Sequence, residues 1–238
     1  MTITETTTIA DIASQLPTSV RVFQRHGIDF CCGGKKPIGA VCREHGLDFA
    51  DVARAIEASR ATADSDTRDW LCEPLSTLTA HIVTVYHQPL RDELPRLQTM
   101  AEKVARVHGG KALYLARLDA IVGELSADLL AHMRKEEMIL FPAIDELTAG
   151  VVGRRFPIDG PIAVMEHEHD HAGDLLEELR VITGGYQAPD WACATTRALY
   201  QGLAELESAM HVHVHLENNV LFPRALDLMR NSSTRAEA

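Results

Sequence analysis

The sequence predicts an all-α protein in which a small helical module precedes an antiparallel four-helix bundle. Ala, Leu and Glu are abundant and aromatic residues make up only 5% of the chain, a composition that favours helix. In four long segments, apolar residues recur in alternating steps of three and four, as on the buried face of a bundle helix. Loops rich in Gly and Pro, such as "VHGGK" and "GGYQAPD", separate these segments.

The predicted N-terminal module spans residues 1–58, and its short amphipathic segments are interrupted by Pro17, Gly27, "CCGGKKP" and Gly46. The small, polar and charged residues of "SRATADSDTRD" form a predicted linker over 59–69. We expect the bundle over residues 70–230 and a flexible tail over 231–238.

Each of the four bundle segments carries a histidine on its apolar stripe. The stripes run from Ala80 through Val83 and His87 to Leu97, from Leu118 through His132 and Glu136 to Ile139, from Ile162 through His169 to Leu179, and from Leu199 through His213 and Glu217 to Val220. In "AMHVHVHLENNVLFP" the histidines alternate, as is typical of a half-buried strand. The three-and-four stripe instead predicts a helix with His213 on its buried face. We expect His211 and His215 to share another face, open to solvent.

The second and fourth segments repeat each other. "HMRKEEMILFP" and "HVHLENNVLFP" share His, Glu four residues later, and then "LFP". His87 precedes His132 by 45 residues and His169 precedes His213 by 44, which indicates two duplicated helical hairpins. Residues equally distant from the turn of an antiparallel hairpin lie side by side, so the four imidazoles should lie at one level of the bundle.

Four imidazoles and two carboxylates in one buried layer predict a metal centre. Any one of these residues alone would more often be an ordinary core or surface residue, so the prediction rests on the whole set. Burying two unpaired carboxylates would cost several kcal/mol each, and cations would remove that cost. Six ligands with two carboxylates able to bridge suit a pair of metals. Iron, zinc and manganese all accept such ligands, although the absence of cysteine from the stripes argues against a cysteine-type zinc site.

A second candidate site is the pair Cys31 and Cys32 in "DFCCGGKKP". Adjacent cysteines seldom bridge each other, and the glycine turn that follows could expose a thiol whose pKa Lys35 and Lys36 would lower. The alternative is that either cysteine packs as a small apolar residue. Cys42, Cys72 and Cys193 lack such surroundings and are predicted to be structural.

Composition limits the partners and the compartment. A net charge of −11 without a long basic run argues against nucleic acid and anionic membranes as partners. No apolar run is long enough to span a bilayer, and "MTITETTTIADIA" lacks the features of a signal peptide. Five cysteines, an odd number, fit free thiols in a reducing cytoplasm.

Nearly the whole chain resembles a known family. The bundle resembles the hemerythrin-like domains, and together with the module it is similar to the repair-of-iron-centres family, whose di-iron proteins mend iron–sulfur clusters damaged by nitric oxide or oxidants. The resemblance rests on "DFCCGG", "HMRKEEMILFP", "VMEHEHDHAGDLLEEL" and "HVHLENNVLFPRA".

The resemblance implies a non-haem di-iron centre bridged by carboxylates and an oxo group. Its ligands would be the histidines His87, His132, His169 and His213 and the bridging carboxylates Glu136 and Glu217. Glu168 matches an acidic residue that would line access to the metals. Asp128 stands where the family often has Glu, as a candidate supporting acid, and Pro89 would kink the first helix near its ligand.

The resemblance implies that the protein repairs damaged iron–sulfur clusters by iron donation. As a hypothesis for the mechanism, the donated iron passes by way of Cys31 or Cys32. Two alternatives remain at this point. One is reduction of nitric oxide at the di-iron centre, which would make the protein an enzyme. The other is an oxygen or nitric oxide carrier or sensor. The module with its cysteine pair argues against a simple carrier, which would not need it.

Overall fold

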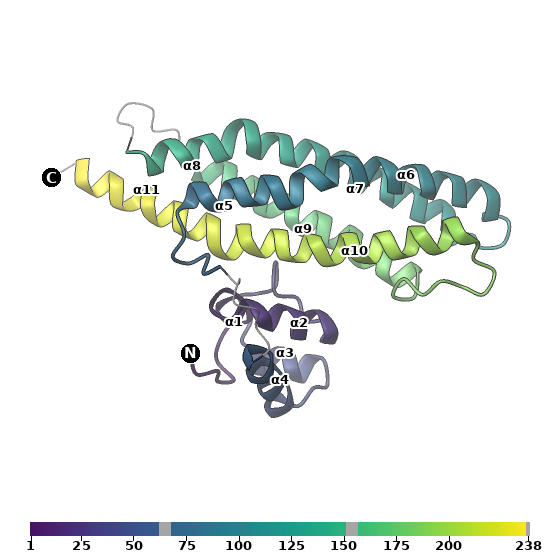
Figure 1. Ribbon diagram of the computed structural model, residues 1–238, viewed down its shortest axis with the longest axis horizontal. Helices are drawn as coiled ribbons and strands as arrows, with labels where there is room; N and C mark the ends of the chain where they lie inside the picture. The colour runs from purple at the N-terminus through teal and green to yellow at the C-terminus, as the bar shows by residue number, and fades with distance from the viewer. Residues whose placement is uncertain (62–67, 151–156, 237–238) are drawn as a thin grey trace. The chain divides into compact units, whose positions relative to one another are not determined.

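The computed structural model describes residues 1–61, 68–150 and 157–236 (Figure 1). The regular structure of these residues is helical, apart from one isolated bridge between Thr8 and Pro37. The predicted all-α fold is therefore confirmed. The chain divides into two compact units, Ala80–Glu146 with Val152–Met210, and Met1–Thr79 with Leu147–Val151 and His211–Ala238.

The four-helix bundle belongs to the first of these units except for its residues 75–79, 147–148 and 211–236, which belong to the second. Its helices, with the segments that continue them, are α5 (Leu75–Ile82), η2 (Val83–His87) and α6 (Gln88–His108); α7 (Tyr114–Lys135), η3 (Glu136–Leu140) and α8 (Phe141–Thr148); α9 (Asp159–Ile182); and α10 (Ala194–Leu216), η4 (Glu217–Leu221) and α11 (Phe222–Ala236).

The predicted stripes form most of the bundle core. Leu97, Leu118, Leu179 and Leu203 are completely or almost completely buried. Helix α6 packs against α7, and α7 packs against α9. Helices α6 and α10 approach closely at Gly202, where a Cβ atom would lie 2.7 Å from Leu97 Cδ2. Glycine at this position therefore sets how closely the two helices pack.

In the part of the chain that the structure describes, three five-residue π-helical turns interrupt the bundle helices, and the sequence did not predict them. His87 is the last residue of η2, Glu136 is the first of η3, and Glu217 is the first of η4. A π-helical turn holds one more residue than an α-helical turn and often marks a functional site. Each of these turns thus begins or ends at a predicted metal ligand.

The π-helical turns correct part of the predicted stripes. Ile139 is half exposed while Leu140 is buried, because η3 adds one residue after Glu136. Likewise Ala80 is exposed, and the buried residue before His87 is Ile82, five positions earlier. A strict three-and-four pattern cannot describe such a step.

The irregularity expected near Pro89 is η2, which ends two residues before that proline. Pro89 lies in the first turn of α6, and it has no N–H to donate to the carbonyl four residues earlier. The loss of this bond weakens the α-helical pattern where the π-helical turn occurs.

The N-terminal module consists of α1 (Ile9–Gln15), η1 (Pro17–Ser19), α2 (Val20–His26), α3 (Ile38–Glu44) and α4 (Phe49–Ala61). The Thr8 hydroxyl accepts a hydrogen bond from the Asp11 N–H and so caps α1. Gly27 ends α2 in the left-handed conformation, at φ 63°. Ile12, Phe23, Phe30 and Ile56 are fully buried in the core of this module.

Two boundaries differ from those expected. Helix α4 continues to Ala61, into the predicted linker 59–69, of which 62–67 lies outside the described residues. Helix α11 continues to Ala236, through most of the predicted tail 231–238. Local interactions extend it, since Arg230 pairs with Asp227 and the Ser232 hydroxyl donates to the Leu228 carbonyl.

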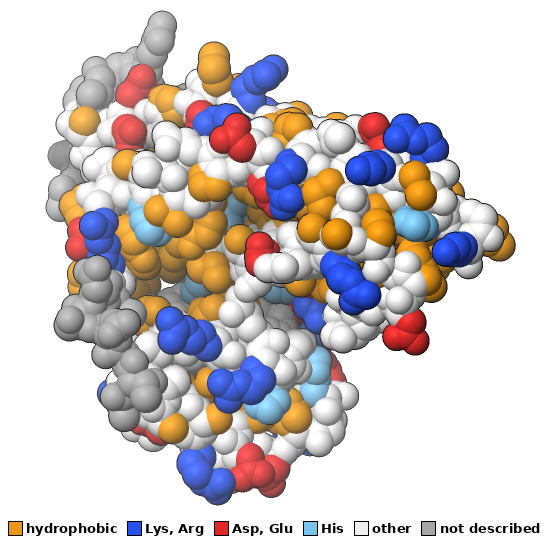
Figure 2. All heavy atoms as spheres, turned by 45° about the vertical axis from the view of Figure 1, so that its right-hand side comes forward, with side chains coloured by type: hydrophobic (Ala, Val, Ile, Leu, Met, Phe, Trp, Pro, Cys, Tyr) orange, Lys and Arg blue, Asp and Glu red, His pale blue; other side chains and the backbone are white. Residues whose placement is uncertain are grey.

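Among the described residues, no helix has both the length and the apolar character needed to cross a membrane. Acidic and basic side chains are interspersed on the face of the molecule that Figure 2 shows.

Candidate metal centre

Two of the predicted histidines are fixed by carboxylates on their outer nitrogens. Nδ1 of His87 lies 2.7 Å from Glu137 Oε1, and Nδ1 of His132 lies 2.9 Å from Glu168 Oε2. A carboxylate at this distance accepts the Nδ1 proton, which fixes the tautomer and places the ring's lone pair on Nε2. Both imidazoles are buried, so both can act as oriented ligands.

Cations keep the two supporting carboxylates ionised. Burial favours a higher pKa for Glu137, but hydrogen bonds from His87 and Arg91 outweigh it and hold the pKa below its usual range. For Glu168, burial is likewise outweighed by hydrogen bonds from Lys135 and His132, and its pKa is also lowered. Each histidine therefore faces a charged acceptor, which strengthens the Nδ1–H bond.

The inner nitrogens of these histidines converge on Glu136. Nε2 of His87 and Nε2 of His132 each lie 3.4 Å from Glu136 Oε2. Glu136 is fully buried, and neither of its oxygens accepts a hydrogen bond from any group in the described part of the chain. Imidazole nitrogens thus face carboxylate oxygens that accept no hydrogen bond, an arrangement that a cation would stabilise.

His169 completes this group from α9. Its Nε2 lies 3.0 Å from the Nε2 of His132, and it is buried. Because Glu168 occupies Nδ1 of His132, the two Nε2 atoms share at most one proton between them. The donor set of three imidazoles and one carboxylate fits a divalent or trivalent transition metal.

Helix α10 and η4 supply the remaining predicted pair. His213 Nε2 lies 3.0 Å from Glu217 Oε1, and both side chains are buried. Ligand atoms of His87, Glu136, His213 and Glu217 all lie within 4.8 Å of one another, and those of His132, Glu136, His169 and Glu217 do the same. The two groups have both carboxylates in common, as two metals with bridging carboxylates would require.

Comparisons with known proteins agree with this arrangement. Residues 78–225 match the hemerythrin HHE cation-binding domain, and residues 5–60 match ScdA_N, a domain of unknown function. The iron–sulfur cluster repair protein YtfE of Edwardsiella ictaluri is 43% identical over 92% of this chain and 96% of its own. YtfE of Yersinia pseudotuberculosis, strain PB1/+, is 40% identical over 90% of this chain and 94% of its own. The chain belongs to the hemerythrin-like iron–sulfur cluster repair family.

The structure gives different positions to the two acids that the family resemblance selected. Glu168 contacts His132 directly, as described above. Asp128 lies at the surface, where its Oδ2 is 3.5 Å from His171 Nε2, beside Glu124. Its shorter side chain on an exposed face of α7 gives it this surface partner instead of a supporting role beside His132.

Glu137 is a residue beside the candidate metal centre that sequence reasoning missed. Its partners, His87 and Arg91, are 50 and 46 positions away in the chain. The only sequence signal is the doubled glutamate at 136 and 137. In a regular α-helix, consecutive side chains point about 100° apart, so the pattern gave no reason to place both near the ligands.

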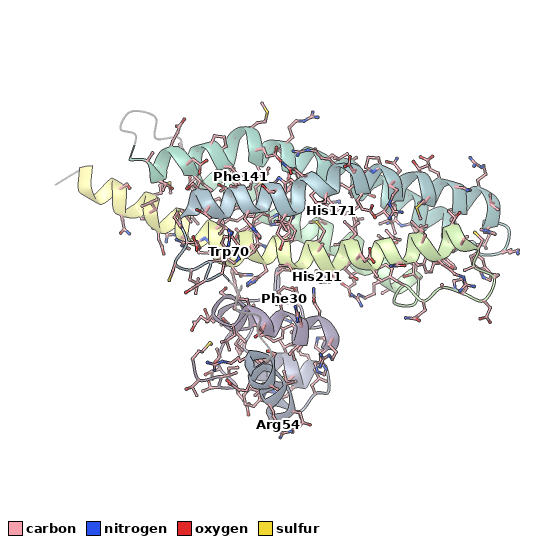
Figure 3. The ribbon with its side chains drawn as sticks, viewed as in Figure 1. Phe30, Arg54, Trp70, Phe141, His171 and His211 are labelled. Carbon is pink, nitrogen blue, oxygen red and sulfur yellow. The ribbon has the colours of Figure 1, made fainter. Side chains whose placement is uncertain are left out.

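His215 is buried, contrary to the expectation that it faces solvent. The ring of Phe30 covers this face: its centroid lies 5.6 Å from that of His215 and 6.0 Å from that of His211. Figure 3 shows Phe30 and His211 directed toward each other. Burial lowers the pKa of His215 to about 4, although its hydrogen bond to the Phe30 carbonyl opposes the shift.

The Cys31–Cys32 turn is organised by Asp29. The Asp29 carboxylate accepts the backbone N–H groups of Cys31, Cys32 and Gly33 and also the Cys31 thiol, at 3.2 Å. Cys31 is buried, and its pKa is raised well above the ordinary value by its hydrogen bond with Cys32, by burial and by Asp29. The expected lowering of the thiol pKa by nearby lysines is therefore wrong for Cys31. Cys32 is partly exposed.

The other cysteines differ from one another. Cys42 is buried, which agrees with a structural role, whereas Cys72 and Cys193 are exposed, so that interpretation is wrong for these two. Cys193 directly precedes α10, and its Sγ lies 3.4 Å from the Thr196 hydroxyl and 3.4 Å from His108 Nε2. Hydrogen bonds from Thr196 and then His108 lower the pKa of Cys193 to about 6.

The two exposed thiols should differ in the pH dependence of their alkylation. Because only the thiolate reacts, labelling of Cys193 by iodoacetamide should rise through a pH of about 6 and level off near neutrality. The hydrogen bond with Asp69 raises the pKa of Cys72, so its labelling should still increase beyond pH 9.0. Peptide mass analysis would follow both sites in one sample, and identical profiles would contradict this assignment.

Proposed function

We propose that this protein repairs damaged iron–sulfur clusters with iron held at the buried histidine–glutamate centre. The observation that carries the proposal is Glu136: a fully buried carboxylate without a hydrogen-bond donor among the described residues, surrounded by imidazole nitrogens. Relatives 40–43% identical over nearly the whole chain are named iron–sulfur cluster repair proteins.

We assign two iron ions to six residues. Four of them are histidines, one from each helix of the bundle, and two are the shared glutamates. The set is His87, His132, Glu136, His169, His213 and Glu217. The ligand chemistry alone also accepts zinc or manganese, and iron is chosen because a repair reaction must supply it. When bound, the iron pair supplies an exchangeable ion for a cluster that has lost one.

Residues around the ligands hold them in position. Glu137 and Glu168 orient His87 and His132 through their Nδ1 protons, and Arg91 and Lys135 keep those carboxylates charged. Oriented imidazoles bind a metal more tightly than freely rotating ones. These outer contacts let the protein retain iron until a client accepts it.

The clients in this proposal are iron–sulfur proteins damaged by nitric oxide or oxidants, in the cytoplasm of a stressed cell. Cys31 and Cys32 would form the route by which iron leaves the protein. Cys32, which is partly exposed, would be the first contact with a client, and the buried Cys31 would follow.

The metal content tests the centre directly. Anaerobically purified protein should contain about two irons per chain, and the double variant Glu136→Ala, Glu217→Ala should lose them because it lacks both shared carboxylates. Elemental analysis for iron, zinc and manganese gives the result, with helical circular dichroism as the check on folding. Iron-free wild-type protein, or iron retained in a folded double variant, would reject the centre.

The supporting carboxylate should affect metal retention without being a ligand. Glu137→Gln keeps the size of the side chain but removes its charge, and should weaken iron binding about tenfold or more. Competition with a chromogenic chelator would measure this. Glu146→Gln, the same change at an exposed position of α8, is the matched control and should bind iron like the wild type.

The cysteine pair should be needed for transfer but not for metal binding. The double variant Cys31→Ser, Cys32→Ser should keep its iron and fail to restore activity to a client enzyme with a damaged cluster. The variant Cys72→Ser, Cys193→Ser removes the two exposed thiols and should repair normally. Full repair by the first variant would remove Cys31 and Cys32 from the mechanism.

A further inference from the structure

The backbone of the Cys31–Cys32 turn is held by the side chain of Asn219. The Asn219 amide donates to the Phe30 carbonyl at 3.2 Å and to the Cys31 carbonyl at 3.1 Å. Nδ1 of His215 lies 3.3 Å from the same Phe30 carbonyl and 3.1 Å from the Asn219 amide nitrogen. All four residues belong to one compact unit of the structure.

The turn cannot satisfy these two carbonyls by itself. Asp29 accepts the N–H groups of Cys31, Cys32 and Gly33, as described above, and its carboxylate has no donor to offer the Phe30 and Cys31 carbonyls. A side chain would not fit at either of the two following glycines. A Cβ at Gly33 would lie 2.8 Å from Asp29 Oδ2, and one at Gly34 would lie 2.8 Å from the Phe30 carbonyl oxygen. Carbonyls removed from water need a donor, and Asn219 supplies one to each, beside His215 at the Phe30 carbonyl.

Asn219 lies on the same π-helical turn as a candidate metal ligand. It is the third residue of η4, whose first residue is Glu217. Helix α1 of the module also packs against η4. A metal ion held by Glu217 and His213 would fix this turn, whereas its loss would leave a buried carboxylate uncompensated and the turn free to rearrange.

We propose that Asn219 is a positioning residue that links metal occupancy to the accessibility of the Cys31 thiol. With metal bound, η4 is fixed and Asn219 keeps Cys31 in its buried position. When the metal leaves, η4 relaxes, the two hydrogen bonds weaken and Cys31 becomes accessible. The link to metal rests on the proposed metal centre, whereas the hold of Asn219 on the turn does not.

Site-resolved thiol labelling tests both parts. The full-length protein, iron-loaded or stripped with a chelator, is treated briefly with N-ethylmaleimide and then analysed by peptide mass. In the wild type, Cys31 should react slowly when iron-loaded and faster when stripped. In Asn219→Ala, Cys31 should react about tenfold faster than in the loaded wild type, because two hydrogen bonds are lost, and the iron dependence should disappear. Cys72 and Cys193 serve as internal references with unchanged rates.

Matched variants separate the amide from the turn as a whole. Asn218→Ala makes the same change one residue away and should behave like the wild type. Asn219→Asp keeps the size but cannot donate, and it should expose Cys31 if Asn219→Ala does not fold. Equal exposure of Cys31 in Asn218→Ala, or unchanged labelling in a folded Asn219 variant, would overturn the proposal.

The two parts can fail separately. A wild type that binds no iron would reject the proposed metal centre and, with it, the link to metal occupancy. The comparison of metal-free wild type with metal-free Asn219→Asp would still decide whether Asn219 holds the turn. Equal Cys31 labelling in these two samples would reject that role.

Discussion

The carboxylate of Glu136 is fully buried between imidazole nitrogens and accepts no hydrogen bond from the described residues. A polypeptide core does not tolerate such a charge without compensation. The surrounding groups are arranged for this need: the outer nitrogens of His87 and His132 are occupied by acids, so their inner nitrogens present lone pairs toward the same space. A cation bound between these groups would balance the charge of Glu136.

The bundle adapts its helices to this centre. Regular α-helical steps would point the residues after each ligand in a different direction. The extra residue in η2, η3 and η4 allows a ligand and its neighbouring hydrophobic residues to face the interior together. The wider π-helical turns thus occur only at candidate ligands, and the rest of each described bundle helix is α-helical.

The fold class and the grouping of the six candidate ligands could be predicted from the sequence. Both follow from the helical periodicity and the internal repeat, which can be read directly along the chain. The sequence misplaced Ala80 and Ile139, since a π-helical turn leaves no mark in an alternating pattern. It also missed Glu137 and the burial of His215. Both depend on residues far away in the chain, His87 in the first case and Phe30 in the second, which no local pattern connects.

The π-helical turns also bear on the ancestry of the chain. In both repeated halves, η3 and η4 begin at the glutamate four residues after the histidine, and both end just before the Phe-Pro pair of "LFP". If one hairpin was duplicated, as the repeated sequence indicates, the same π-helical turn at the same place would have been copied with it. The turn η2 has no counterpart in α9, which is α-helical throughout, so the backbones of the two halves differ at their other histidine, His87 in one and His169 in the other.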